Sequence, residues 1–147
     1  MSATFYSGFK YKDSVLSFLM DNIYSAFQMR SNICVVLKDS QSKQDFEVKQ
    51  KQKYFENSKI EYLYAKNIEF LETEPQEQFD EIHIFSDKVA NLDINLSKTV
   101  YVYTTSADED VNKASRTLYT NLKLKNFELK HEACLLYTSP SPRDVCS

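Results

Sequence analysis

The scarcity of glycine constrains this chain more than any other feature of its sequence. Gly8 is the only glycine among 147 residues, and glycine lets a backbone approach a phosphate closely or turn with a positive φ. A P-loop needs glycines around its phosphate nest, and a dinucleotide or S-adenosylmethionine loop needs several where the first strand meets its helix. The sequence therefore excludes the familiar glycine-rich nucleotide motifs.

Length and composition indicate one globular domain. The chain has 42% hydrophobic residues, 10 Tyr, 10 Phe and a net charge of -3. This balance argues against a disordered acidic tail and against a basic nucleic-acid surface. No apolar run reaches the roughly 18 residues of a membrane span, and no signal peptide is recognisable at the N-terminus. We therefore expect a cytoplasmic protein that contacts neither nucleic acid nor membrane.

The cysteines and histidines form no metal-binding motif. Cys34, Cys134 and Cys146 lack any C-x-x-C spacing, and adding His83 and His131 makes no recognisable zinc or cluster site. We expect free thiols, which are typical of a reducing compartment.

The segment from Cys134 to Asp144 differs in character from everything before it. It holds two of the three prolines and resembles the in-frame translation of a transposase adapter used to build sequencing libraries. We therefore expect residues 134–147 to be a non-native tail that adds nothing to stability, the natural chain being interrupted near Ala133. A native Ser/Pro-rich linker leading to a second domain is the alternative.

The rest of the chain alternates predicted helices and strands. Apolar residues at three- and four-residue steps predict a helix over 13–30 with Asp13 as N-cap, and the uninterrupted run Ile33–Leu37 predicts a strand buried on both faces. Further helices are predicted over 41–57, over 67–77 and after a capping box of Ser106 and Glu109, and further strands over 60–64, 80–85, 99–103 and 125–130. This alternation predicts an α/β fold with a three-layer, mostly parallel sheet.

Asp80, Glu81 and His83 place ionisable groups at the beginning of a predicted strand, whereas open α/β sheets carry their active residues at the carboxyl end. We therefore interpret His83 as a partly buried histidine with satisfied hydrogen bonds, and proton transfer is the minor alternative. Ser86 and Asp87 lie at the carboxyl end, a better place for chemistry, but neither has an obvious partner histidine or base.

Three other groups have simpler structural explanations. Asp108, Glu109 and Asp110 could suggest a metal site, but acidic residues favour the positive end of a helix dipole. Cys34 lies inside an apolar strand and is expected to be an inert hydrophobe. Tyrosines that alternate on two predicted strands could stack on bases, but no Lys or Arg cluster accompanies them, so we expect them to pack on the sheet: Tyr62, Tyr64, Tyr101 and Tyr103.

Several segments together resemble the N-terminal domain of the anamorsin family of cytosolic iron-sulfur assembly factors. These are Ile33–Ser40, Asn67–Leu71, Phe79–Ile82, Val111–Leu118 and Leu122–Glu128, in the order of that family's first strand and turn, short helix, FD-initiated strand, late helix and closing strand. Two positions depart from the family. Its Pro-Gly-Gly turn is replaced by residues 95–98, and the glycine after its late helix is Asn126, which tolerates a left-handed backbone.

The resemblance implies a degenerate, Rossmann-like S-adenosylmethionine methyltransferase fold over residues 32–133. Residues 1–31 have no counterpart in the family, and we expect them to form an N-terminal helical extension. The resemblance implies no catalytic, cofactor-binding or metal-binding residue in this chain. In the family, 2Fe-2S and 4Fe-4S clusters bind in a Cys-rich C-terminal domain, a diflavin reductase is the partner, and the protein occupies the cytoplasm and the mitochondrial intermembrane space.

We therefore expect a non-catalytic interaction or scaffold domain that ends before the cluster-binding domain. The alternative is an enzyme, either a divergent methyltransferase or half of a nucleotide-sugar glycosyltransferase. The loop over residues 38–42 separates these possibilities, because it has no glycine to bring backbone N–H groups against a cofactor.

Overall fold

The computed structural model describes residues 1–28, 30–54, 67–93, 95–97 and 99–134. These residues form the strands and helices β1 Ser2–Ser7, α1 Lys12–Gln28, β2 Ile33–Leu37, α2 Ser40–Tyr54, β3 Ile68–Leu71, β4 Glu81–Phe85, β5 Thr99–Tyr103, α3 Glu109–Leu124 and β6 Glu128–Ala133. No described helix is long and apolar enough to cross a membrane.

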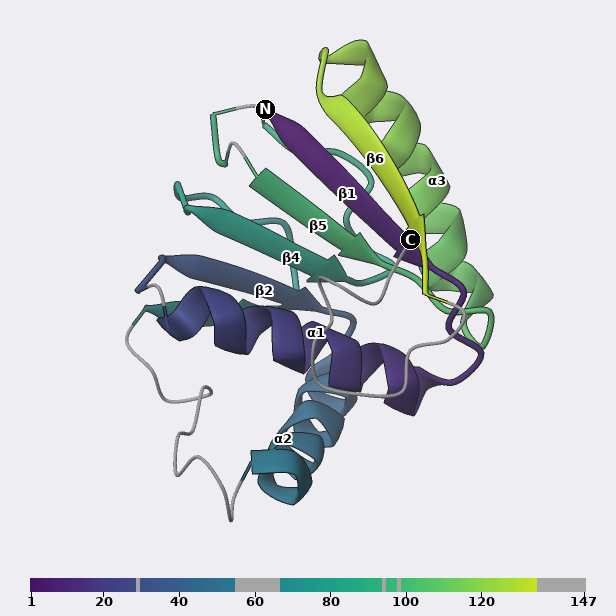
Figure 1. Cartoon of the computed structure of the whole chain (residues 1–147). Coiled ribbons are helices and arrows are strands. Elements are labelled where there is room, and N and C mark those ends of the chain that lie inside the picture. Colours follow the sequence, from purple (N-terminus) through teal and green to yellow (C-terminus); the bar gives the residue numbers. More distant parts are fainter. Residues whose placement is uncertain (29, 55–66, 94, 98, 135–147) are drawn as a thin grey trace.

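The six strands form one all-parallel sheet in the order β3-β2-β4-β5-β1-β6. Helices α1 and α2 cover one face and α3 covers the other, as Figure 1 shows. The predicted three-layer, Rossmann-like α/β fold is therefore confirmed. The strand order differs from the 3-2-1-4-5-6 order of dinucleotide-binding domains, because β1 lies beside β5 and β6 rather than beside β2.

The buried residues divide into two layers, one on each face of the sheet. Strand β2 shows the division, since Ile33, Val35 and Leu37 face α1 and α2 while Cys34 and Val36 face the α3 side. All five are at most 1% exposed, so the uninterrupted apolar run does mark a strand covered on both faces.

The N-terminal segment is part of the α/β domain, because Ser2–Ser7 form a strand of the sheet and Lys12–Gln28 form a helix that covers one of its faces. Strand β1 pairs in parallel with β5 on one side and with β6 on the other. Its residues Ala3, Phe5 and Tyr6 are buried. The expected boundary at residue 31 is therefore wrong, because an inner strand supplies both neighbours with main-chain hydrogen bonds and side-chain packing.

Two predicted elements differ from the structure. Residues 67–77 were expected to form a short helix, but Ile68–Leu71 form β3, which extends the sheet by pairing with β2. The predicted N-terminal capping box is also wrong, because Asp108 is the N-cap of α3. The predicted strand over residues 60–64 lies outside the described residues, as do Tyr62 and Tyr64.

The chain turn after α3 uses a left-handed residue, as the sequence allowed. Asn126 has φ 64. Strand β6 then begins at Glu128, three residues later than predicted, because Lys125 still caps the helix.

Cys134 does not project from the domain as the expected start of a foreign tail would. It is 2% exposed, and its N–H donates to the carbonyl of Ser7 at 2.7 Å, extending the pairing of β6 with β1. Cys134 is disulfide-bonded, so the expectation of free thiols holds for Cys34 and is corrected for Cys134. Residues 135–147 lie outside the described part of the chain.

Candidate functional site at the carboxyl edge of the sheet

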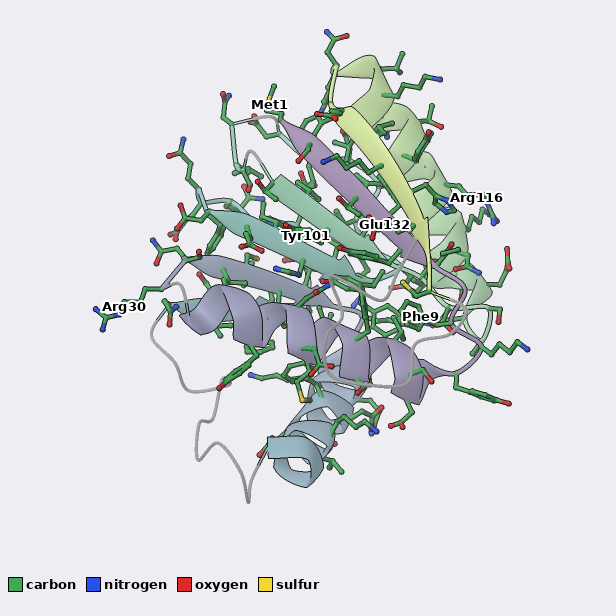
Figure 2. All side chains as sticks on the ribbon, in the orientation of Figure 1. Met1, Phe9, Arg30, Tyr101, Arg116 and Glu132 are labelled. Carbon is green, nitrogen blue, oxygen red and sulfur yellow. The ribbon has the colours of Figure 1, made fainter. Side chains whose placement is uncertain are left out.

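The place where a ligand would bind in this fold is set by the strand order. The connection after β2 leads toward the β3 edge of the sheet, and the connection after the neighbouring strand β4 leads toward the β6 edge. Open α/β sheets bind ligands outside the carboxyl ends of strands at such a switch point. Here Lys38 follows β2, and Ser86 and Asp87 follow β4. In Figure 2, Met1 and Arg30 mark the amino edge of the sheet and Phe9 marks the carboxyl edge.

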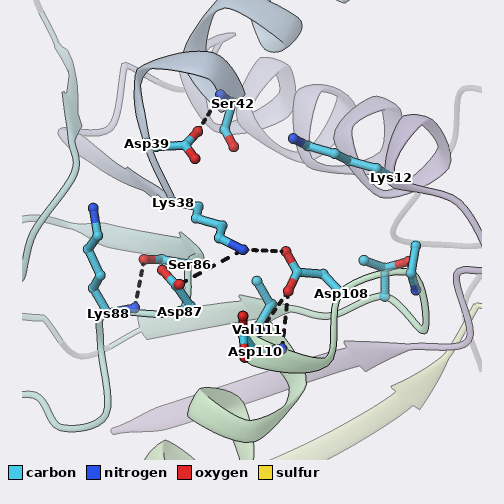
Figure 3. A network of polar contacts seen from close by, with 12 residues as sticks. Lys12, Lys38, Asp39, Ser42, Ser86, Asp87, Lys88, Asp108, Asp110 and Val111 are labelled. Carbon is cyan, nitrogen blue, oxygen red and sulfur yellow. Dashed lines mark hydrogen bonds and ion pairs between the residues drawn. The ribbon is translucent and has the colours of Figure 1, made fainter.

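An ion-pair network bridges this switch point. Lys38 Nζ donates to Asp108 Oδ2 at 2.9 Å and lies 3.8 Å from Asp87 Oδ2. Figure 3 shows the lysine pointing from the end of β2 toward both carboxylates, one after β4 and one at the start of α3. The three side chains are 24–28% exposed. They therefore connect the ends of β2 and β4 with the start of α3, the segments between which an α/β protein of this kind would bind a cofactor.

The network holds its charges at neutral pH. The hydrogen bond to Asp108 raises the pKa of Lys38, and nearby carboxylates add to this effect. Burial acts to raise the pKa of Asp108, but hydrogen bonds from Lys38 and from the N–H groups of Val111 and Asp110 outweigh it and lower that pKa. Lys38 and Asp108 are therefore both charged at neutral pH, and their ion pair holds the start of α3 against the end of β2.

The carboxylate of Asp39 lies at the N-terminus of α2. Asp39 Oδ1 accepts the N–H of Ser42 at 2.8 Å. That backbone hydrogen bond lowers the pKa of Asp39. Helix N-termini at this edge are where α/β proteins bind phosphate. In this chain, the carboxylates of Asp39 and Asp108 take the place of a phosphate at the N-termini of α2 and α3.

His83 lies inside the domain, away from the carboxyl edge. It is fully buried, its Nδ1 lies 2.7 Å from the Tyr103 hydroxyl, and its Nε2 lies 3.1 Å from Glu81 Oε1. Tyr103 also accepts from Asn22 Nδ2 at 3.0 Å, so its hydroxyl links the histidine to α1. The histidine stacks on Tyr101 with ring centroids 4.8 Å apart. The interpretation of His83 as a hydrogen-bonded core residue is confirmed, with complete rather than partial burial.

The remaining candidates have structural roles. Asp80 Oδ2 accepts the N–H of Asn32 at 2.8 Å at the amino edge. Ser86 Oγ accepts the N–H of Lys88 at 3.1 Å. Burial raises the pKa of the Cys34 thiol to about 12, with a smaller contribution from Glu69, so Cys34 is the inert hydrophobe that its position predicted.

The acidic run at the start of α3 is a helix-terminus feature. Asp108 caps the helix, and Glu109 pairs with Arg116 at 2.8 Å. The described residues contain no group of three or more His, Cys, Asp or Glu side chains that could hold a metal ion. Asp108 was predicted as one acid in a helix turn, but its pairing with Lys38 was missed because 70 positions separate the two.

No family model matches the chain, and neither does any curated protein or solved structure. The α/β fold is shown by the six-stranded sheet itself.

Proposed function

We propose that this chain is the non-catalytic N-terminal domain of an anamorsin-like cytosolic iron-sulfur assembly factor and serves as a protein-interaction scaffold. One observation carries the non-catalytic part: the chain's own ions occupy the carboxyl edge at the switch point. Asp39 and Asp108 cap α2 and α3, two of the three helices that begin at this edge, and Lys38 bridges the switch point. The α/β sheet is of the kind that the resemblance implies.

The physical case against a nucleotide is electrostatic. A phosphate placed at either helix N-terminus would displace Asp39 or Asp108 from its backbone donors or lie beside it. Two like charges about 4 Å apart repel by ~1 kcal/mol in water and by ~4 kcal/mol near a protein surface. S-adenosylmethionine meets a different obstacle, since residues 38–42, the connection after β2 and the first residues of α2, contain no glycine that would let the backbone approach a ligand closely.

Thermal denaturation tests this part of the proposal. We expect no rise in the unfolding midpoint of the protein with ATP, NAD or S-adenosylmethionine at millimolar concentration. A rise of several degrees requires preferential binding to the native state and would favour the enzymatic alternatives. The variant Asp39→Ser/Asp108→Ser keeps good N-cap residues and removes both charges. If that variant bound phosphate and the parent protein did not, the two carboxylates would be the groups that prevent phosphate from binding.

The proposed likeness to the anamorsin family can be tested on the genomic sequence that encodes this chain. We expect the genomic sequence downstream of the codon for Ala133 to encode, in frame, a Cys-rich segment. The full-length protein should then bind iron-sulfur clusters, with visible absorption that disappears on reduction, and should accept electrons from a purified diflavin reductase. A downstream frame without clustered cysteines would refute the assignment.

A further inference from the structure

A second part of the carboxyl edge is open. On the α3 side, a cavity of about 720 Å³ lies between the ends of β1 and β6 and the first turns of α3. This volume falls within the range of small-molecule sites, about 300–1,000 Å³. The cavity is separate from the Lys38 network, because neither Lys38 nor Asp87 nor Asp108 lines it.

The lining offers an aromatic surface for an apolar body. Phe5 and Tyr119 meet edge to face with ring centroids 5.2 Å apart, and both line the cavity. Phe5 is 4% exposed and fixed in the sheet, whereas Tyr119 is 38% exposed. Aromatic edges and faces of this kind favour a flat ring against them.

The polar groups around the cavity favour an anion. Lys10 and Arg116 both line it, and no carboxylate is among its described lining residues. Ser7 Oγ and His131 Nε2 lie 3.1 Å apart on adjacent strands, which adds a hydroxyl and an imidazole to the same wall. Gly8, with φ 92, follows Ser7 and keeps that wall free of a side chain. Arg116 already holds one carboxylate, that of Glu109, and its planar fork suits carboxylates in general.

One hydrogen-bond acceptor in the cavity lining has no donor among the described residues. Asn112 lines the cavity, and its Oδ1 is buried without a hydrogen-bond partner among the described residues. A buried acceptor left without a donor destabilises the folded state, because it has lost its hydrogen bonds to water. A ligand N–H or O–H that reached this oxygen would restore a hydrogen bond to it.

We propose that this cavity binds a small carboxylic acid with an aromatic body and a hydrogen-bond donor. The carboxylate lies toward Lys10 and Arg116, the ring lies against Phe5 and Tyr119, and the donor reaches Asn112 Oδ1. This ligand class goes beyond the proposed scaffold function. It is also independent of the absence of nucleotide binding, since the cavity shares no residue with the Lys38 network.

Three probes of matched shape test the proposal on the intact protein by amide NMR titration. 4-Hydroxyphenylacetate carries the acid, the ring and the donor, phenylacetate lacks the donor, and tyramine lacks the acid. We expect saturable shifts at Ser7, Gly8 and Asn112 with the first probe, weaker binding of the second and weakest binding of the third. Equal affinities for all three probes, or shifts confined to other residues, would overturn the proposal.

Variants on one helix separate the two recognition elements. Arg116→Gln should weaken 4-hydroxyphenylacetate binding about tenfold, as expected for loss of a charge-assisted hydrogen bond. Asn112→Leu should remove the preference for 4-hydroxyphenylacetate over phenylacetate. Lys113→Gln, an exposed change of the same charge on the same helix, is the matched control and should bind like the parent. If Lys113→Gln weakened binding as much as Arg116→Gln, the attraction would be general and the cavity assignment wrong. Should a variant fail to give a folded spectrum, the three-probe comparison on the parent decides alone.

Discussion

Replacing Asp108 should reveal how strongly the bridged switch point holds the domain together. Its Oδ1 accepts the N–H groups of Asp110 and Val111 at 3.1 and 3.2 Å, and its Oδ2 accepts from Lys38 at 2.9 Å. Loss of an N-cap to alanine costs ~1 kcal/mol. A hydrogen bond between charged groups contributes ~1.5–3 kcal/mol when buried, and exposure of about a quarter of each side chain reduces this to ~1 kcal/mol.

Asp108→Ala should therefore lower the free energy of unfolding by ~2 kcal/mol. Asp108→Asn keeps a good N-cap and loses only the charge, so it should cost ~1 kcal/mol. Urea denaturation measures both effects. With a slope of ~2 kcal/mol/M, typical of a small protein, the alanine variant should unfold at ~1 M less urea. Asp110→Asn in the same turn is the control and should stay within about 0.5 kcal/mol of the parent.

A double-mutant cycle gives the decisive result. Lys38→Met should cost ~1 kcal/mol in the parent and clearly less in the Asp108→Ala background, because only the longer ion pair with Asp87 remains there. Equal costs in both backgrounds would show that the two side chains do not interact in solution. The bridge at the switch point, and with it the explanation for a closed cofactor crevice, would then be refuted.

Four further outcomes follow from the same structure. Tyr103→Phe, which removes a hydroxyl with two buried hydrogen-bond partners, should lower the free energy of unfolding by ~1–3 kcal/mol in urea. Cys34, with its pKa raised to about 12, should resist alkylation in the native protein and react only once urea unfolds it. The pKa values of Asp39 and Asp108 are lowered from 3.8, so their stabilisation is complete above about pH 5 and is lost as pH falls below that value. Unfolding free energy measured from about pH 5 to about pH 2 should therefore fall more steeply than in the Asp39→Asn/Asp108→Asn variant. A chain without residues 1–31 should show no cooperative thermal transition, because an inner strand and a buried helix are missing.

The parts of the fold that the sequence predicted are those specified by neighbouring residues. The run Ile33–Leu37 has no polar position, so its burial on both faces could be inferred directly. The alternation around His83 placed it opposite Ile82 and Ile84, which pack on the α3 side. Asn126 could be assigned a left-handed turn because few other residues tolerate one.

Errors arose where a local pattern had a competing explanation. Ser106 and Glu109 match a capping box, but Asp108 is the cap because its side chain can accept two N–H groups and a lysine at once. Residues 67–71 have a composition that permits a helix, but Ile68–Leu71 form a strand because they pair with β2. Neither decision is visible in a window of a few residues.

The position of β1 could not be predicted at all, and it determines the character of the carboxyl edge. Its register pairs Phe5 with Val102 on one side and with His131 on the other, so the strand is fixed by residues from the far end of the sequence. Because β1 ends between β5 and β6, Ser7 and Gly8 come to lie beside His131 and the start of α3, where the cavity is. A first strand placed beside β2 would instead end at the Lys38 network. The carboxyl edge is therefore closed at the switch point between β2 and β4 and open beside β1. A ligand site in this domain is expected beside β1.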